Sequence, residues 1–438
     1  MKDSQSAEPS RRGAVEPSRR GSAVQPFRAM ELLKDVDRLR AAGRDTYLLC
    51  LGQPSTPAPK PVITAATRAL ASDNLGYTAT NGLPAAREAI AAYYLSTYHV
   101  IVDPARILIT TGSSAAFTAL FLAAFDAADT VLVTNPGYPA YRETLAALDL
   151  TVVELPCRAD TDWQPTVPQL EEWVARTGVT PRGLVVASPA NPTGTVIPAN
   201  RLRELVAWCE EHAVLLISDE IYHGIIYGDE PVSTAIEFSQ DVVSVGSFSK
   251  YFSMTGWRLG WAIVPEQLVR PVDLLLGNLN LSAPTLSQLA APAAFTPEAL
   301  AELDDHVARY ATNRNTVLAQ LSELDVPAIA PADGAFYAWV DVSAYLAPAD
   351  AAGAEASATA PQADAAGAEA SAHPGPRTSE QLCREILEHT GVAVTPGADF
   401  DTEVGDRFIR ISYAGATEDV ETGMRLLTEY LRAQRAAR

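Results

Sequence analysis

Lysine is scarce in this chain of 438 residues, because only four of its 33 basic residues are lysines. Three of them, Lys2, Lys34 and Lys60, precede residue 61, and the fourth is Lys250. It lies in SVGSFSKYFSMTGWRLGW, residues 244–261, among small hydroxyl residues and eight positions before Arg258. Such a lone lysine raises the question of whether its amine is reactive.

Cysteine is also scarce, with four residues at least 52 positions apart: Cys50, Cys157, Cys209 and Cys383. No CxxC or CxxH pairing occurs, which argues against a zinc cluster and against a redox pair. We therefore expect no metal site, and this cysteine usage fits a reduced, cytoplasmic setting.

Long apolar runs are missing as well, and so is any excess of positive over negative charge. No run approaches the roughly 18 apolar residues that span a bilayer, and no apolar stretch follows the pairs Arg11-Arg12 and Arg19-Arg20, as an export signal requires. The net charge is −20, and such an acidic chain lacks the basic surface that binding to nucleic acid or to an anionic membrane requires. We expect a cytoplasmic protein with neither partner.

Two segments contain few bulky apolar side chains, and each contains a repeat. EPSRRG occurs at residues 8–13 and 16–21, and ADAAGAEASA occurs at 349–358 and 363–372. Segments of this composition bury too little apolar surface to offset the conformational entropy that is lost when a chain becomes ordered. We expect a mobile N-terminal tail, residues 1–29, and a bland mobile insertion, residues 347–378.

Short apolar strands alternate with helical segments in most of the remaining chain. The strand candidates are 106–111, 130–136, 183–189, 214–220, 241–247 and 260–265, and two helix candidates are 112–125 and 198–213. Continuous apolar runs are typical of strands covered on both faces, as in a parallel sheet. We predict an α/β large domain over residues 61–299, with a mostly parallel sheet flanked by helices. A smaller α+β domain is expected from both chain ends, residues 30–60 and 300–438.

Ligands of open α/β sheets gather beyond the carboxyl ends of the strands. Ser113 and Ser114 start a helix after one strand, where N–H groups and hydroxyls either bind an anion or merely cap the helix. Asp219 ends another strand, where it could be a Mg²⁺ ligand, a helix cap or the partner of a ligand nitrogen, and the phenol of Tyr222 follows three residues later. Asn191 precedes a proline in a segment that usually means only a turn, and Arg410 lies in a strand-like segment, where most arginines are surface residues.

Together these residues describe one site, with an anion cradle, a fixed carboxylate, a phenol, an amide and a single lysine. Lysine acts as a nucleophile through a Schiff base to a carbonyl, and this needs a pKa lowered by burial or by a nearby cation. Pyridoxal 5′-phosphate is the cofactor that suits this set.

The chain resembles the class I/II aminotransferases of the fold type I pyridoxal-phosphate family. The motifs that carry the resemblance run in the family's order over roughly residues 30–435: GYTATNGLPAAREAIAAYY, TNPGYPAY, SPANPTGT, SDEIYHG, SFSKYFSMTGWRLGW and RFIRISYA. The resemblance implies that Lys250 binds the cofactor covalently and moves the substrate proton, while Asp219 pairs with the ring nitrogen. It implies that Asn191 and Tyr222 bond the ring oxygen.

The resemblance also implies a role for the other candidates. Tyr138 would stack on the ring, and the phosphate would be held by Ser113, Ser114, Ser247 and Arg258. Arg410 would bind the substrate α-carboxylate, for which a guanidinium suits better than an ammonium. Gly52 would let an N-terminal segment close over the substrate, and Tyr77 would reach the phosphate of the neighbouring subunit in a homodimer.

The implied reaction is a ping-pong transfer of an amino group from an L-amino acid to a 2-oxo acid, either 2-oxoglutarate or pyruvate. Neutral or aromatic donors are favoured over aspartate, because Gly112-Ser113-Ser114-Ala115 offers no second cation, although Arg142 could supply one. The same scaffold also supports C–S lyases, cyclopropane-forming synthases and ligand sensors. A sensor fused to a DNA-binding module needs a longer, basic N-terminal domain.

Overall fold

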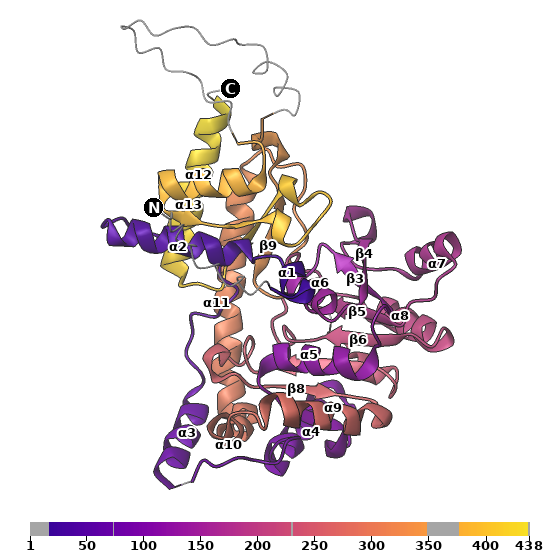
Figure 1. Ribbon diagram of the computed structural model, residues 1–438. Coiled ribbons are helices and arrows are strands. Elements are labelled where there is room, and N and C mark those ends of the chain that lie inside the picture. The colour runs from indigo at the N-terminus through magenta and orange to yellow at the C-terminus, as the bar shows by residue number, and fades with distance from the viewer. Residues whose placement is uncertain (1–16, 73, 229–230, 348–375, 437–438) are drawn as a thin grey trace, which may run out of the picture.

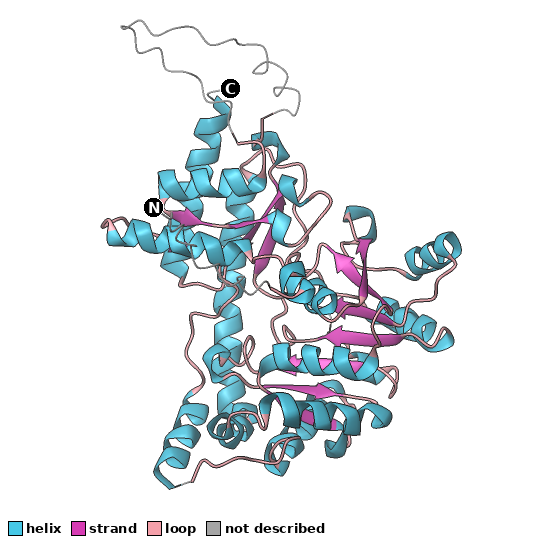
Figure 2. Cartoon of the chain, viewed as in Figure 1, coloured by secondary structure: helices cyan, strands magenta, loops and turns pink. Residues whose placement is uncertain are grey.

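The computed structural model describes residues 17–72, 74–228, 231–347 and 376–436 (Figure 1). The α-helices are α1 (Arg19–Ala23), α2 (Arg28–Ala41), α3 (Lys60–Ser72), α4 (Pro84–Tyr98), α5 (Gly112–Ala124), α6 (Pro139–Ala147), α7 (Val167–Thr177), α8 (Ala199–Glu211), α9 (Glu266–Asn280), α10 (Thr285–Ala290), α11 (Pro297–Ser322), α12 (Ser379–Thr390) and α13 (Thr417–Ala436). The strands are β1 (Tyr47–Leu48), β2 (Ile107–Thr110), β3 (Thr130–Asn135), β4 (Thr151–Pro156), β5 (Gly183–Ala187), β6 (Leu215–Asp219), β7 (Val243–Ser247), β8 (Gly260–Ile263), β9 (Tyr337–Asp341), β10 (Val392–Ala393), β11 (Thr395–Pro396) and β12 (Phe408–Ser412). Helices surround the strands in both parts of the molecule (Figure 2).

A seven-stranded sheet forms the larger part of the fold, in the order β2-β8-β7-β6-β5-β3-β4. Every pairing among β3 to β7 is parallel, whereas β8 is antiparallel to both of its neighbours, β2 and β7. This confirms the predicted α/β class with a mostly parallel sheet. Because β5, β6 and β7 run in the same direction, the residues that follow them meet at one edge of the sheet.

Alternate strand residues belong to separate hydrophobic layers on the two faces of this sheet. Val131 and Val133 of β3 belong to a cluster with residues of α5, α6 and α9, whereas Leu132 belongs to one with residues of α4, α7 and α8. Helices therefore cover both faces, which explains the continuous apolar runs in the sequence. The buried apolar area of the two layers is the main source of stability for this sheet.

The second part of the fold combines a three-stranded antiparallel sheet, in the order β11-β12-β9, with α2, α12 and α13. Segments from near both chain ends meet here, since Tyr47–Leu48 of β1 pairs in parallel with Val392–Ala393 of β10. The exact domain boundaries, 30–60 and 300–438 for the small domain and 61–299 for the large one, stay a prediction.

The predicted tail, residues 1–29, and the predicted insertion, residues 347–378, are described only in part. Residues 1–16 and 348–375 lie outside the described residues. Residues 17–29 contain the short helix α1, whose Arg19 and Arg20 form ion pairs with Asp149 just beyond α6. The two arginines of the second EPSRRG copy therefore share an acidic partner on the folded chain. The mobility expected of the tail and of the insertion stays a prediction.

Candidate active site

A cavity of about 320 Å³ opens where β5, β6 and β7 end and where β12 of the second part approaches them. We call it the Lys250 chamber. Ten of the twelve residues singled out in the sequence line it: Gly52, Ser113, Ser114, Tyr138, Asn191, Asp219, Tyr222, Lys250, Arg258 and Arg410. Residues far apart in the chain are therefore gathered at the edge of the sheet where ligands of α/β folds bind.

Lys250 lies three positions after β7, and its amine donates a hydrogen bond to the Gly52 carbonyl oxygen at 2.7 Å. Burial lowers the pKa of Lys250 to about 8, and the Arg410 and Arg258 guanidinium groups act in the same direction, whereas Asp219 opposes them. A substantial fraction of this amine is therefore neutral near pH 8, as a nucleophilic lysine requires.

Asp219 is the last residue of β6, and its carboxyl group is buried. Burial raises the pKa of Asp219 to about 7, although hydrogen bonds donated by the Tyr141 hydroxyl and the Ile221 N–H oppose this rise. It forms no ion pair among the described residues. A ligand carrying a protonated nitrogen would supply the missing positive charge.

The Arg258 guanidinium lies close to the N-terminus of α5 in the lining of the chamber. Gly112, the first residue of α5, has φ +73°, and a Cβ added there would lie 2.5 Å from Arg258 Nη2. Arg258 donates to the Thr255 carbonyl oxygen and pairs with no carboxylate among the described residues. Free N–H groups, the Ser113 and Ser114 hydroxyls and a guanidinium together form a site for an anion such as phosphate.

Arg410 extends from β12 into the opposite side of the chamber and is buried. Its Nη1 donates to Asn191 Oδ1 at 2.8 Å, and its Nη2 donates to the Cys50 carbonyl oxygen at 2.7 Å and to Thr395 Oγ1 at 3.2 Å. The guanidinium is thus held in place and still has N–H groups for a ligand carboxylate.

Two of the predicted site residues do not line the chamber. Ser247 is buried at the end of β7, and its hydroxyl donates to Ser249 Oγ at 3.0 Å, so that Ser249 lines the chamber instead. Tyr77 is 85% exposed and lies away from the chamber of its own chain.

Sequence reasoning missed Tyr141 and Tyr337, both of which line the chamber. Tyr141 lies in the first turn of α6, three positions after the N-cap residue Tyr138, and the two ring centroids are 5.4 Å apart. The Tyr337 hydroxyl lies 2.7 Å from that of Tyr222. In the sequence, Tyr337 is one of several aromatic residues in the strand-like segment GAFYAWVDV, residues 334–342, and nothing there marks it as a site residue.

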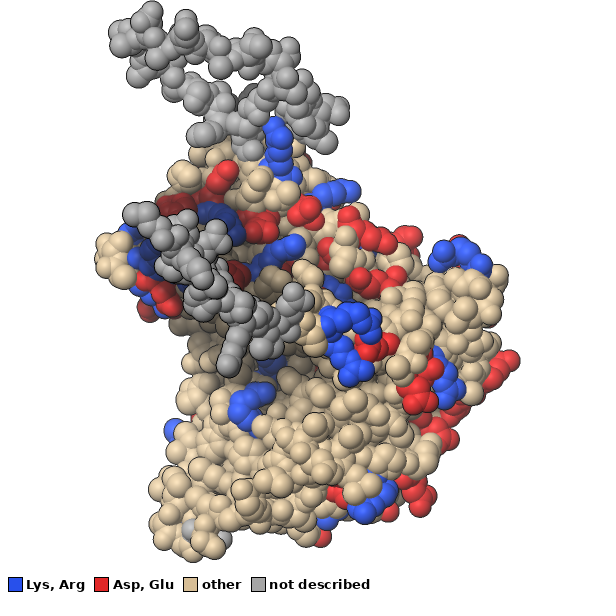
Figure 3. Space-filling view, viewed as in Figure 1, with Lys and Arg blue, Asp and Glu red and all other residues tan. Residues whose placement is uncertain are grey.

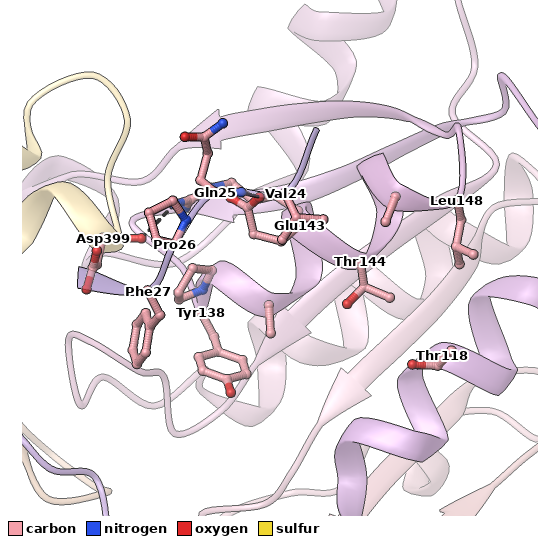
Figure 4. Close-up of a pocket in the computed structure, with 14 residues that line it drawn as sticks. Val24, Gln25, Pro26, Phe27, Thr118, Tyr138, Glu143, Thr144, Leu148 and Asp399 are labelled. Atoms are coloured by element: carbon pink, nitrogen blue, oxygen red, sulfur yellow. Dashed lines mark hydrogen bonds and ion pairs between the residues drawn. The ribbon is translucent and has the colours of Figure 1, made fainter. Parts of the chain in front are cut away.

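A second cavity, of about 470 Å³, adjoins the chamber and shares Phe27, Thr118, Tyr138, Ala140 and Thr144 with it (Figure 4). We call it the outer cavity. Arg142 lies on its lining, but its Nε pairs with Glu143 and its Nη2 donates to the Asp399 carbonyl oxygen at 2.7 Å. The cation that the sequence offered for a second carboxylate is therefore already engaged.

Comparison with known proteins agrees with this geometry. A family model described as aminotransferase class I and II matches residues 44–425. The chain belongs to the class I and II aminotransferases. A valine–pyruvate aminotransferase of Mycobacterium tuberculosis is 45% identical over 419 residues, covering 94% of this chain and 98% of that protein. An aspartate/prephenate aminotransferase of Thermus thermophilus is 32% identical, covering 92% of this chain and 95% of that protein.

Solved structures give the same family. A crystal structure of an aminotransferase from Mycobacterium tuberculosis matches with a TM-score of 0.86 and 43% identity, covering 96% of this chain and all of that one. The Thermus thermophilus aspartate aminotransferase with maleate matches with a TM-score of 0.81 and 28% identity, covering 95% of this chain and 100% of that one. The aminotransferase transfers an amino group between an amino acid and a 2-oxo acid. These relatives favour transamination over the lyase, synthase and sensor alternatives.

Proposed function

We propose that this aminotransferase holds pyridoxal 5′-phosphate in the Lys250 chamber, with Lys250, Asp219 and Tyr222 as catalytic residues. The observation that carries the proposal is the pairing of a neutralisable lysine amine with a buried carboxylate that has no cation partner in the described chain. The remaining lining fits the same group. Tyr138 offers a ring for stacking, Asn191 and Tyr222 offer donors for the ring oxygen, and the anion site offers Ser113, Ser114 and Arg258, backed by Ser247 through Ser249.

The cofactor, when bound, supplies an aldehyde carbon that takes up the amino group and a ring that withdraws electrons from the substrate. Lys250 Nζ, with its pKa of about 8, accepts and returns the substrate proton near neutral pH. Asp219 stabilises a positive charge on the ring nitrogen, because its buried carboxylate gains an ionic partner there. Asp219 is buried and Lys250 is partly buried, and removal from water strengthens the electrostatic interactions of both groups.

Arg410 binds the α-carboxylate of the amino acid and of the 2-oxo acid. Its guanidinium is pre-positioned by Asn191 Oδ1 and the Cys50 carbonyl oxygen, so that little side-chain entropy is lost when the substrate arrives. Gly52 lies on the same side, where its carbonyl oxygen accepts from Lys250 and its backbone closes against the substrate.

The substrate is an amino acid with an uncharged side chain, aliphatic or aromatic, rather than aspartate. The three cations that line the chamber, Lys250, Arg258 and Arg410, each have another role in this scheme, and Arg142 is engaged beside the outer cavity. The 45% identical relative is named for valine and pyruvate, which have uncharged side chains. We propose pyruvate or 2-oxoglutarate as the acceptor.

The active form is a homodimer in which Tyr77 of one chain reaches the cofactor phosphate of the other. The backbone around Tyr77 is held, since Thr285 Oγ1 donates to the Gly76 carbonyl oxygen at 2.6 Å and Gln288 Nε2 donates to Thr78 Oγ1 at 3.0 Å. The ring itself is 85% exposed. Further exposed apolar side chains lie on α3 and at the end of α9, namely Ile63, Leu70, Leu279 and Leu281. The lower part of the face in Figure 3 carries few charged side chains.

We place the enzyme in the cytoplasm, as its cysteine usage favours. All four cysteines are free and buried. Among the residues that the structure describes, none of the helices has the length and apolar character to cross a bilayer.

A substrate panel tests the proposed reaction. With pyruvate as acceptor, kcat/KM for valine, methionine and phenylalanine should exceed that for aspartate by about tenfold or more, because aspartate would bury an unpaired carboxylate. A preference for aspartate would show that a cation outside these residues binds the second carboxylate. Ammonia and pyruvate released from cystathionine without an acceptor would favour a lyase.

A further inference from the structure

Tyr337 contacts three residues of the Lys250 chamber that have roles in the proposed reaction, namely Tyr222, Gly52 and Arg410. It is the first residue of β9 and is 1% exposed. Its hydroxyl lies 2.7 Å from that of Tyr222, and a Cβ added to Gly52 would lie 2.0 Å from the Tyr337 oxygen. The glycine at position 52 is therefore required because the Tyr337 hydroxyl fills the space that a side chain would take.

The Tyr337 ring also contacts the substrate-binding arginine. The guanidinium carbon of Arg410 lies 4.4 Å from the centroid of the Tyr337 ring and 4.6 Å from that of Phe400. Arg410 Nε is buried without a hydrogen-bond partner, so these rings provide the stabilisation along that side of the guanidinium. The β9–β12 register pairs Tyr337 with Ser412 and Trp339 with Arg410, which sets the ring beside the arginine.

The hydroxyl pair has a preferred direction. Burial raises the pKa of both phenols, so each hydroxyl keeps its single proton, and either could donate across the 2.7 Å contact. In the proposed function the Tyr222 proton is donated to the ring oxygen of the cofactor, which leaves Tyr337 as the donor and the Tyr222 oxygen as the acceptor in this pair.

We propose that Tyr337 is a positioning residue of this aminotransferase: its ring fixes the plane of Arg410 for the substrate carboxylate, and its hydroxyl turns the Tyr222 hydroxyl toward the cofactor. The inference rests on the proposed function of the chamber. The Tyr337 side chain then has two separate effects, since its ring acts on carboxylate binding through Arg410 and its hydroxyl acts on the cofactor through Tyr222.

Two variants separate these effects in the holoenzyme. Tyr337→Phe keeps the ring and loses the hydroxyl, whereas Tyr337→Leu loses both. Tyr310→Phe is the matched control, because Tyr310 is a fully buried tyrosine whose hydroxyl bonds Thr56 Oγ1 at 2.9 Å and which does not line the chamber. The readouts are the pH midpoint of the visible absorption of the bound cofactor and the Kd of isovalerate, an unreactive monocarboxylate, measured by spectral titration.

Tyr337→Phe should move the pH midpoint upward by roughly 0.5 pH unit or more and leave the isovalerate Kd within about twofold. Tyr337→Leu should move the midpoint equally and weaken isovalerate about tenfold. Tyr310→Phe should change neither value. If both Tyr337 variants match the Tyr310→Phe control in midpoint and Kd, Tyr337 is only a core residue and the inference is wrong. A wild-type protein without a visible band would instead overturn the proposed function, and this inference with it.

Discussion

Asp219 is a carboxyl group that the protein buries beside a lysine and leaves without an ion pair among the described residues. Its pKa is about 7 in the folded protein, against an ordinary value of 3.8. The unfolded chain therefore releases this proton at lower pH than the folded chain does. The stability that the protonated form provides is fully present below pH 3.8 and is lost as the pH rises through 7, a loss of about 4 kcal/mol.

Substituting Asp219→Asn should therefore have opposite effects on the two forms of the protein. The apoprotein should be at least as stable as the wild type at pH 8, because the amide still accepts from Tyr141 and needs no proton. The affinity for pyridoxal phosphate should fall by about tenfold or more, since an amide gives the ring nitrogen no negative partner. Thermal unfolding of apoprotein at pH 4–8 and a cofactor titration measure both effects. A less stable apoprotein with unchanged cofactor affinity would contradict this account of Asp219.

Some residues of the Lys250 chamber could be predicted from the sequence, whereas others could not. Lys250, Asp219 and Asn191 could be predicted to lie together because each lies at or just beyond the carboxyl end of a strand in one mostly parallel sheet. Tyr337 and Tyr141 could not, because a buried aromatic residue in a strand or helix resembles an ordinary core residue. Only the register of β9 against β12 and the turn of α6 bring them to the chamber.

At the scale of elements, the sequence predicted the six strands that carry continuous apolar runs, and the structure confirms a strand within each. It missed β4, Thr151–Pro156, which lies at the edge of the seven-stranded sheet. Most of β4 is exposed or half-buried, so its sequence lacks the run of apolar residues that marked the others. The strand at the opposite edge, β2, is buried along its whole length and was therefore predicted.

The N-terminus of α5 depends on Gly112 in two ways. Its φ of +73° disfavours any other residue, and a Cβ would lie 2.5 Å from Arg258 Nη2. Gly112→Ala should lower the free energy of unfolding by about 1–2 kcal/mol and weaken cofactor binding about tenfold, because it displaces the guanidinium from the anion site.

Gly256→Ala is a suitable control for this prediction. Gly256 lies two positions from Arg258, and a Cβ there would meet nothing within 4 Å. Chemical denaturation and cofactor titration of both variants provide the comparison. Equal cofactor affinity in Gly112→Ala and Gly256→Ala would show that the anion site does not need the bare backbone at Gly112.

At the scale of the whole molecule, the prediction is that each active site takes residues from two chains. Lys250→Ala and Tyr77→Ala chains, each impaired as a homodimer, should complement each other when refolded together. The mixed dimer has one site with both Lys250 and Tyr77, so random assortment should restore about a quarter of wild-type activity. Activity assays across mixing ratios measure this recovery.

Arg258→Ala mixed with Lys250→Ala is the control for complementation. Both residues line the same chamber of one chain, so no mixed dimer contains an intact site, and activity should stay at the level of the parents. Recovery in this mixture, or none in the Tyr77 mixture, would contradict a site shared through Tyr77.

The central claim is that the amine of Lys250 is where the vitamin B6 cofactor attaches. Borohydride reduction of folded protein supplied with pyridoxal phosphate, followed by peptide mass mapping, tests it most directly. The account predicts a pyridoxyl group on the peptide that contains Lys250, and none on Lys34 or Lys60, which lie outside the chamber. A reduced, folded protein whose Lys250 peptide carries no such group would contradict the account.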